Sequence, residues 1–405
     1  MHSCAVYATI YWYNCRFKEV LFLSQEIYLD NSATTKPCPE AIAAANEMML
    51  RFWGNPSSTH AKGNEAAQKL REARRSVASA ISAAPEEIFF TSGGTEANNI
   101  AVFGAAAKNR RAGRRIVTSA IEHSSVLDSV SELEKQGFEV IRLMPDIHGH
   151  IPPEAVAEAV NSNTVLITMM MVNNEVGSIL PIEHAVKAAR RKAPKAIVHC
   201  DCVQAFGKIP VNVKKLGADM ITLSAHKIAS PKGCGALYKR KGLHIPSLTF
   251  GGHQEDSFRP GTEAAALIAA FGAAAAIACD KTGMSKRYST VKTLRDYTIE
   301  KLGKINGIVF NSPDDALPYI VNFSTRCVKA ETMLNFLSER GIYVSGGSAC
   351  AKGEPSHVIK ALDLPRDAAD SAIRVSFSAG NTTDEVDALA EAVAEGINKL
   401  AHFAY

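Results

Sequence analysis

The sequence lacks several features that would assign a class of protein at once. Its nine cysteines in 405 residues include no spaced CxxC pairs, so neither a disulfide framework nor a metal site is indicated. Its 45 Lys and Arg stand against 41 Asp and Glu without basic runs, which argues against nucleic-acid binding. No apolar run reaches the roughly 18 residues of a membrane span. We therefore expect small-molecule chemistry in a reducing, cytoplasmic setting, without a membrane partner.

The start of the chain has little pattern. Residues 1–26 are rich in aromatic side chains and precede IYLDNSATT, which has the composition expected at the start of a fold. Few basic residues occur there, so neither a signal peptide nor a transit peptide is indicated. We expect an extension outside the fold, explained first by an over-extended translation start and otherwise by a minor targeting or contact role.

The rest of the chain has the pattern of an α/β protein. From about residue 65, short apolar strands alternate with helical segments, which predicts a largely parallel sheet. Strands are expected within 87–94, 114–120, 138–144, 164–172, 196–202 and 218–227. Helices are expected within 64–82, 95–111, 124–137 and 173–192. We predict a large domain over 35–280 and a smaller α+β domain formed by 27–34 and 281–405, after the Ala-rich helix of 262–279.

Polar residues follow the apolar strands, at the place where ligands bind in open α/β sheets. Five strand ends carry candidates: Ser92 to Thr95, Glu122 with His123, Asn173 with Asn174, Asp201 to Gln204, and Ser224 to Lys227. Cys200 and Cys202 flank Asp201. Alternate residues of a strand face the same side, so buried packing of the two thiols is favoured over a chemical role.

Lys227 is the most informative of these residues. It ends the strand-like TLSAHK beside Ser224 and His226, before a proline and a glycine that prevent a long helix. A desolvated lysine in such a place can form a Schiff base, although a single lysine is usually a solvated surface charge. Pyridoxal phosphate is the cofactor that needs such a lysine.

That cofactor makes further demands, and the sequence offers a candidate for each. Its phosphate favours a helix N-terminus with close backbone approach, which Gly94 and Thr95 in TSGGTEANN offer. Its pyridine nitrogen requires a carboxylate, which Asp201 offers. Its ring requires a flat partner, which His123 offers. Taken singly, Thr95 or Asp201 could be a helix or turn cap, and His123 could be structural.

Together these segments make the chain resemble the cysteine desulfurases of the NifS/IscS type, within the class V aminotransferase fold. The resemblance runs from about residue 27 to the end. It rests on YLDNSATT, GNPSSTH, FTSGGTEANN, VNNEVG, HCDCVQAFGK, SAHKIASPKG, RPGT, GGSAC and the region of Arg374. It implies a pyridoxal-phosphate transferase of fold type I that acts on L-cysteine.

The resemblance also implies residue roles. Lys227 would hold the cofactor, Asp201 would bind its pyridine nitrogen, and His123 would stack on its ring. Further contacts to the cofactor are implied for Gly94, Thr95, Asn174, Gln204, Ser224 and His226, and for Thr262 toward the neighbouring subunit's cofactor. That last contact implies a homodimer. Asn174 and Arg374 would bind the substrate, although an interior arginine can also pair with a structural carboxylate.

Cys350 is the implied sulfur acceptor. It lies in GGSACAKG, whose small residues permit a mobile loop, and the thiolate is the attacking form of cysteine. Without this setting, a free cysteine is usually a small buried hydrophobe. Cys350 would take the sulfur of L-cysteine as a persulfide, release L-alanine, and pass the sulfur to an iron–sulfur scaffold or a thiolation enzyme. The loop is about two residues shorter than in long-loop members, so the acceptor stays open.

Two other readings remain open at this point. The same fold could support selenocysteine lysis or another class V aminotransferase-type reaction, for which Cys350 would be dispensable. The chain could also be a sulfur-relay or iron–sulfur assembly scaffold without catalysis, although the intact set of Lys227, Asp201 and His123 argues against that.

Overall fold

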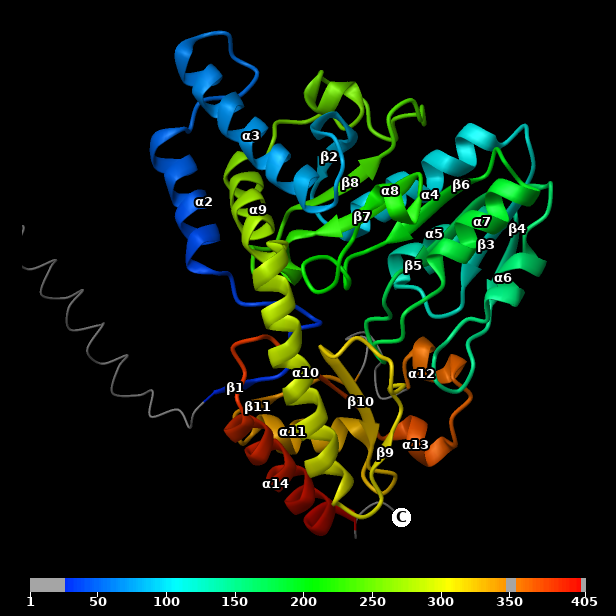
Figure 1. The fold of residues 1–405 in the computed structure, drawn as a ribbon, viewed down its shortest axis with the longest axis vertical. Coiled ribbons are helices and arrows are strands. Elements are labelled where there is room, and N and C mark those ends of the chain that lie inside the picture. Colours follow the sequence, from blue (N-terminus) through cyan, green and yellow to red (C-terminus); the bar gives the residue numbers. More distant parts are fainter. Residues whose placement is uncertain (1–25, 347–354, 402–405) are drawn as a thin grey trace, which may run out of the picture.

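The central feature of the fold is a seven-stranded sheet (Figure 1). The computed structural model describes residues 26–346 and 355–401. Spatially, the strands run β2 (Ile88–Thr91), β8 (Gly235–Lys239), β7 (Met220–Ser224), β6 (Ile197–Asp201), β5 (Thr164–Met170), β3 (Arg115–Ser119) and β4 (Glu139–Leu143). β8 is antiparallel to both of its neighbours, so the other six strands share one direction. The predicted α/β class with a mostly parallel sheet is confirmed.

Both faces of this sheet are buried. Successive side chains of a strand point to opposite faces, so neighbouring residues of one strand pack in different apolar clusters. In β5, Leu166 packs in one apolar cluster and Ile167 in the other. The same division separates Ile197 from Val198 in β6. The central strands therefore need apolar residues at consecutive positions, which explains their continuous apolar runs.

Some helices pack on the sheet, and others form a second group that packs together. α4 (Gly94–Asn109) packs on five of the strands and on α5 (Ser124–Lys135), whereas α7 (Ile182–Lys192) packs on β5, β6 and α6 (Pro153–Ala159). A second group joins α9 (Ala265–Ala278) to α2 (Pro39–Arg51) and α3 (Ala61–Ala80). The remaining helices are α8 (Val213–Leu216), α10 (Lys281–Gly303), α11 (Ala330–Ser338), α12 (His357–Ala361), α13 (Arg366–Asp370) and α14 (Thr383–Leu400).

The C-terminal part of the chain forms two small sheets below the large one in Figure 1. One has the order β12 (Ala372–Ser376), β10 (Ile320–Ser324), β9 (Val309–Phe310) and is antiparallel. The other pairs β1 (Ile27–Tyr28) with β11 (Ile342–Tyr343) in parallel. The start of the described chain thus joins strands that lie about 300 residues later. The predicted division near residue 280 falls between α9 and α10 and stays a prediction.

Sequence patterns located most elements but missed some. The strand segments predicted before residue 230 all contain strands, with ends within a few residues of expectation. The helix expected within 173–192 begins only at Ile182, since Asn173 starts a turn and Pro181 precedes the helix. α2, α6, α10 and α14 and the antiparallel strand β8 were not anticipated.

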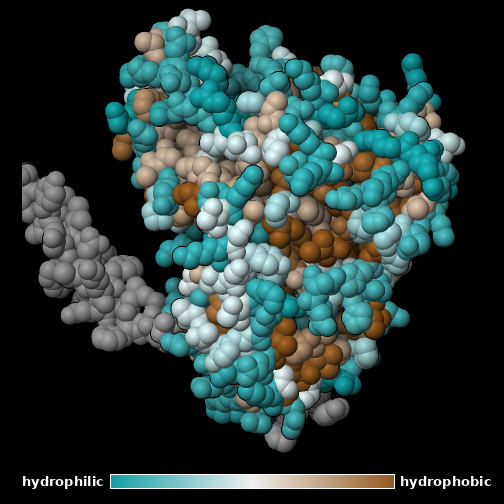
Figure 2. Space-filling model, viewed as in Figure 1, coloured by the Kyte–Doolittle hydropathy of each residue, from teal (hydrophilic) through white to brown (hydrophobic). Residues whose placement is uncertain are grey.

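The surface in Figure 2 is mostly hydrophilic, with hydrophobic residues gathered toward the middle of the visible face. Within the described ranges, no single helix is long and apolar enough to cross a membrane; α9 and α10 meet the length and composition test only as a pair bent by 73°.

The close contact between α9 and α3 requires a residue without a side chain at Gly272. A Cβ at Gly272 would lie 2.5 Å from the Cα of Ala73, which is backbone and has little freedom to move. We expect Gly272→Ala to lower the free energy of unfolding by about 1–3 kcal/mol, measured by urea denaturation. Gly303→Ala is the matched control, because its Cβ would meet only a ring carbon of Phe310 at 3.8 Å. Equal effects of the two substitutions would contradict this explanation.

Candidate active site

The candidate site lies where the carboxyl ends of five strands meet. β2, β3, β5, β6 and β7 run in the same direction, so the residues that follow them gather at one edge of the sheet. The five groups of polar residues expected at strand ends occupy this edge, and side-chain contacts join several of them. The sequence prediction of where the polar groups converge therefore agrees with the structure.

Lys227 lies in a short 3-10 helix, Ala225–Lys227, directly after β7. Its amine donates hydrogen bonds to the carbonyl oxygens of Ser32 at 2.5 Å and Ala33 at 2.8 Å. Burial and the nearby charge of Arg374 lower its pKa to about 8, against partial compensation from two carboxylates. A lysine with this pKa exists partly as the free amine near neutral pH, which is the nucleophilic form.

Asp201 ends β6 and is buried, with 6% of its surface exposed. Its Oδ2 accepts a hydrogen bond from Asn98 at 2.7 Å, and its Oδ1 accepts one from the Val203 amide at 2.9 Å. The same Asn98 amide group also donates to Ser125 at 2.8 Å, and Ser125 contacts Nδ1 of His123 at 2.8 Å. A continuous chain of contacts therefore fixes the carboxylate relative to the imidazole.

The His123 ring is held by the start of α5. Its Nδ1 accepts a hydrogen bond from the Ser125 amide at 3.1 Å, so in the neutral ring the proton lies on Nε2. Desolvation lowers the pKa of His123, and the charges of Lys227 and His357 act in the same direction while that of Asp201 opposes them. A neutral ring is therefore favoured.

The start of α4 and the end of β7 form a cradle. Gly94 is the first residue of α4, and a Cβ there would lie 3.1 Å from Val203. Ser224 is buried, and its Oγ has no hydrogen-bond partner in the described chain. Thr95 follows at the exposed start of the helix, while Nδ1 of His226 contacts Thr34 at 3.2 Å. An orphaned hydroxyl beside a helix N-terminus suits an anion.

Gln204 connects two lysines. Its Oε1 accepts a hydrogen bond from Lys208 at 2.8 Å, and its Nε2 donates to the Ser32 carbonyl at 3.0 Å, beside the amine of Lys227. Because an ammonium can only donate, Lys208 fixes which way the Gln204 amide faces. Burial, with the charges of Lys227 and Arg374, lowers the pKa of Lys208 to about 7.

Arg374 lies in β12 and reaches the site from the small sheet. Its guanidinium donates to Asp30 Oδ1 at 2.7 Å and to the Asn174 carbonyl at 2.9 Å, and its Nε is buried without a partner. The ion pair with Asp30 is the structural pairing that the sequence left open. A substrate carboxylate would have to share the guanidinium with Asp30.

Thr262 is the expected site residue that the described chain leaves away from the others. Thr262 is exposed in the loop before α9, and in the described chain it makes no side-chain hydrogen bond to the other candidates. Its expected role involves a second subunit and stays a prediction. Cys350 lies outside the described residues. Cys200 and Cys202 are buried as predicted, with their Sγ atoms 3.4 Å apart.

Several residues of this constellation were missed by sequence reasoning. Asn98 follows Gly94 by four residues, and Lys208 follows Gln204 by four, so a helical period could have suggested them. Asp30 and Ser32 gave no such signal, because their contacts to the site span 344 and 195 residues of chain. No group of three or more His, Cys, Asp or Glu in residues 26–346 and 355–401 could hold a metal ion.

The donor set fits pyridoxal phosphate. A half-buried lysine with a lowered pKa, a buried carboxylate, a neutral imidazole and an unpartnered hydroxyl at a helix start correspond to its aldehyde, ring nitrogen, ring face and phosphate.

Known proteins share the sequence pattern of this chain. The model of the aminotransferase class-V family matches residues 27–389. The chain therefore belongs to the class V aminotransferase family. Among curated relatives, cysteine desulfurase IscS of Methanosarcina thermophila is 40% identical over 391 residues, which cover 96% of each chain. Cysteine desulfurase IscS of Dictyoglomus turgidum is 40% identical over 382 residues, 93% of this chain and 96% of that one.

Solved structures show the same relationship. A NifS-like protein superposes with a TM-score of 0.87 at 34% identity, covering 92% of this chain and 100% of that one. SspA, solved in complex with cysteine, superposes with a TM-score of 0.77 at 32% identity, covering 88% of this chain and 100% of that one. Within the class V family, the chain belongs to the cysteine desulfurases of the NifS/IscS type.

Glu122 gives a prediction that needs no cofactor. This fully buried carboxyl group accepts a hydrogen bond from Ser119, and burial raises its pKa from 4.5 to about 8. The unfolded chain loses this proton near pH 4.5, so between that pH and about 8 the native state binds more protons and loses stability as pH rises. Glu122→Gln should remove that loss.

We therefore expect the unfolding free energy of Glu122→Gln, relative to wild type, to rise by on the order of 3 kcal/mol from pH 5 to pH 8 in urea titrations. Glu132→Gln, which changes an exposed carboxylate of α5, serves as the control and should show little change. A difference that stays constant with pH would show that Glu122 is already ionised in the folded protein.

Proposed function

We propose that the chain is a pyridoxal-phosphate-dependent cysteine desulfurase that converts L-cysteine to L-alanine and carries the sulfur as a persulfide on Cys350. The observation that carries the proposal is the half-buried Lys227 amine with a pKa of about 8, at one sheet edge with the buried Asp201. Membership of the NifS/IscS-type family supports it, as does the bound cysteine of SspA.

The roles proposed for the cofactor site follow from its contacts. Lys227 would hold the cofactor and take the Cα proton of the substrate, while Asp201 would bind the ring nitrogen and His123 would lie against the ring. Further contacts would come from Gly94, Thr95, Asn174, Gln204, Ser224 and His226. When bound, pyridoxal phosphate supplies an electron sink for negative charge at the substrate Cα.

The proposed substrate site consists of Arg374 and Asn174. The Arg374 guanidinium is already oriented by Asp30 and by the Asn174 carbonyl, so a carboxylate would meet donors that need little reordering. In the transfer step, the Cys350 thiolate would attack the substrate Sγ. The Cβ–Sγ bond breaks as the S–S bond forms. Its electron pair stays on the substrate Cβ, which takes a proton to become the methyl group of L-alanine.

The proposed partners are a second subunit and a protein that accepts the sulfur. Thr262 would contact the phosphate site of a second subunit in a homodimer, and an iron–sulfur scaffold or a thiolation enzyme would accept the persulfide sulfur. A cytoplasmic location suits this chemistry because it needs reduced thiols, and the six cysteines within the described ranges are free.

The test is alanine release from L-cysteine by the protein loaded with pyridoxal phosphate, in the presence of a reducing thiol. We expect Cys350→Ala to lose at least about a hundredfold in rate while retaining the visible absorption of the lysine-bound cofactor. Lys227→Ala should lose both the rate and the absorption.

Cys327→Ala is the matched control, because it removes a different cysteine, which is partly buried, and should leave both properties unchanged. If Cys350→Ala keeps the wild-type rate, the sulfur is not carried on Cys350. If L-selenocysteine is processed without Cys350 and L-cysteine is not processed by wild type, selenocysteine lysis replaces the proposal.

A further inference from the structure

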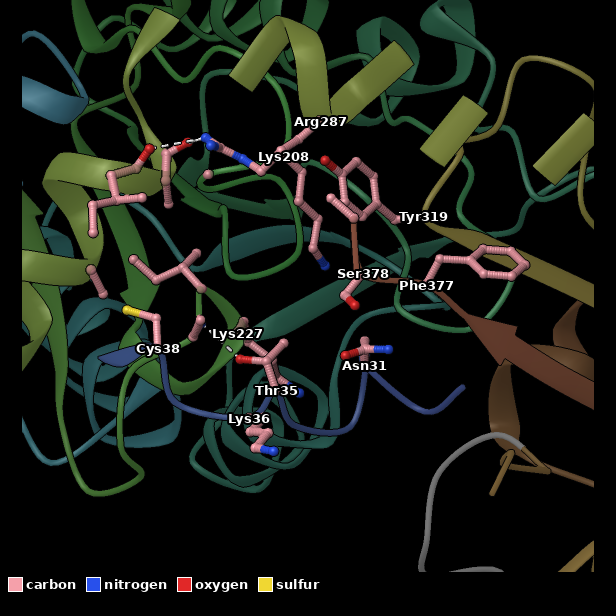
Figure 3. Close-up of a pocket in the computed structure, with 17 residues that line it drawn as sticks. Asn31, Thr35, Lys36, Cys38, Lys208, Lys227, Arg287, Tyr319, Phe377 and Ser378 are labelled. Atoms are coloured by element: carbon pink, nitrogen blue, oxygen red, sulfur yellow. Dashed lines mark hydrogen bonds between the residues drawn. The ribbon is translucent and has the colours of Figure 1, made fainter. Parts of the chain in front are cut away.

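A pocket of about 290 Å³ lies beside Lys227, between the α9–α10 bend and the small sheets (Figure 3). Its lining includes the apolar or aromatic residues Ile228, Ala274, Ile277, Tyr319 and Phe377. This volume is at the lower end of the range for ligand sites and suits a molecule of a few non-hydrogen atoms. Of the residues proposed to bind the cofactor or the substrate, only Lys227 lines the pocket.

The charge of this pocket is unbalanced. Lys36, Lys208, Lys227 and Arg287 line it, and the described lining residues include no aspartate or glutamate. Lys36 is exposed, whereas Lys208 has only 6% of its surface exposed and forms no ion pair with any described carboxylate. A buried ammonium without a counter-charge is costly, and its lowered pKa reflects that cost.

Several hydrogen-bond donors in the pocket have N–H groups without a described acceptor. The Lys208 ammonium has three N–H groups and one hydrogen-bond acceptor among the described residues, Gln204. In Figure 3 its side chain extends along the pocket, with the amine on the side of Ser378. Arg287 uses one of its terminal nitrogens to bind the carbonyls of Ile277 and Ala278 at the end of α9. Its other nitrogens have no described acceptor.

Tyr319 adds a neutral donor. It has 5% of its surface exposed, and its hydroxyl has no hydrogen-bond partner in the described chain although the residue lines the pocket. Burial raises its pKa to about 12, so the phenol keeps its proton and can donate to an anion. The Lys208 amine lies 5.7 Å from the centre of the Tyr319 ring.

We propose that this pocket binds a small monocarboxylate with a short apolar group, its carboxylate held by Lys208 and the Tyr319 hydroxyl. The carboxylate supplies the missing counter-charge, and the apolar group packs on Ile228, Ala274 and Ile277. The site is separate from the proposed substrate site, because Arg374 and Asn174 do not line the pocket.

The experiment measures butyrate binding to the full-length protein saturated with pyridoxal phosphate, by ligand-observed NMR titration. Butyramide has the same shape without the charge, so we expect it to bind at least about tenfold more weakly than butyrate. We expect Lys208→Met to weaken butyrate binding by about tenfold or more, and Tyr319→Phe by several-fold, since each loses a hydrogen bond to the carboxylate.

Two controls separate this pocket from other sites. Arg374→Lys should leave butyrate binding unchanged, whereas loss of binding there with retention in Tyr319→Phe would assign butyrate to the substrate site and overturn the proposal. Lys304→Met removes an exposed lysine of comparable charge and should also have no effect. Tyr319→Phe changes a single hydroxyl, so it keeps the test decisive if Lys208→Met does not fold.

Two further outcomes would also overturn the proposal. Equal binding of butyrate and butyramide would show that the cationic wall is not used. Sulfate binding as tightly as butyrate would show a general anion site without the proposed apolar contact. Because no turnover is measured, failure here is distinct from failure of the desulfurase proposal.

Discussion

The site depends above all on one short segment, residues 27–35, that passes between the large sheet and the small ones. Its first residues pair with β11, and the Asn31 amide donates to the Ser376 carbonyl of β12. A few atoms further on, the carbonyls of Ser32 and Ala33 accept the hydrogen bonds of the Lys227 amine. The acceptors of this lysine are therefore supplied by backbone that the small sheets hold in place.

Contacts of the same kind explain the electrostatics of the site. Lys227, Lys208 and Arg374 lie close enough that each of the two lysines has its pKa lowered by burial and by the Arg374 charge. Asp30 and Asp201 offset part of this positive charge at Lys227. The amine thus gains nucleophilic character from its surroundings, without a dedicated base.

Sequence reasoning placed residues correctly where their position follows from the order of strands along the chain. Strand-end residues such as Asp201 and Lys227 were found because a parallel sheet brings the ends of its strands together, which a pattern of strands and helices predicts. Asp30 and Ser32 were missed because their importance comes from contacts with residues distant in the chain, which no local period records. The pairing of β1 with β11 was beyond sequence reasoning for the same reason. Propensity and period describe neighbours in the chain, whereas these contacts are set by tertiary packing.

Positive charge near the middle of the molecule unites the cofactor site and the neighbouring pocket. Lys208 contributes to both, because it orients Gln204 toward Ser32 on one side and lines the pocket on the other. Buried cations are costly when unpaired, so the folded chain without ligands carries an electrostatic cost that anionic groups can relieve. The phosphate of the proposed cofactor and the carboxylate of the proposed substrate are such groups. The positive charge of the fold therefore favours anion binding at this edge of the sheet, and Lys208 contributes to that charge on both sides.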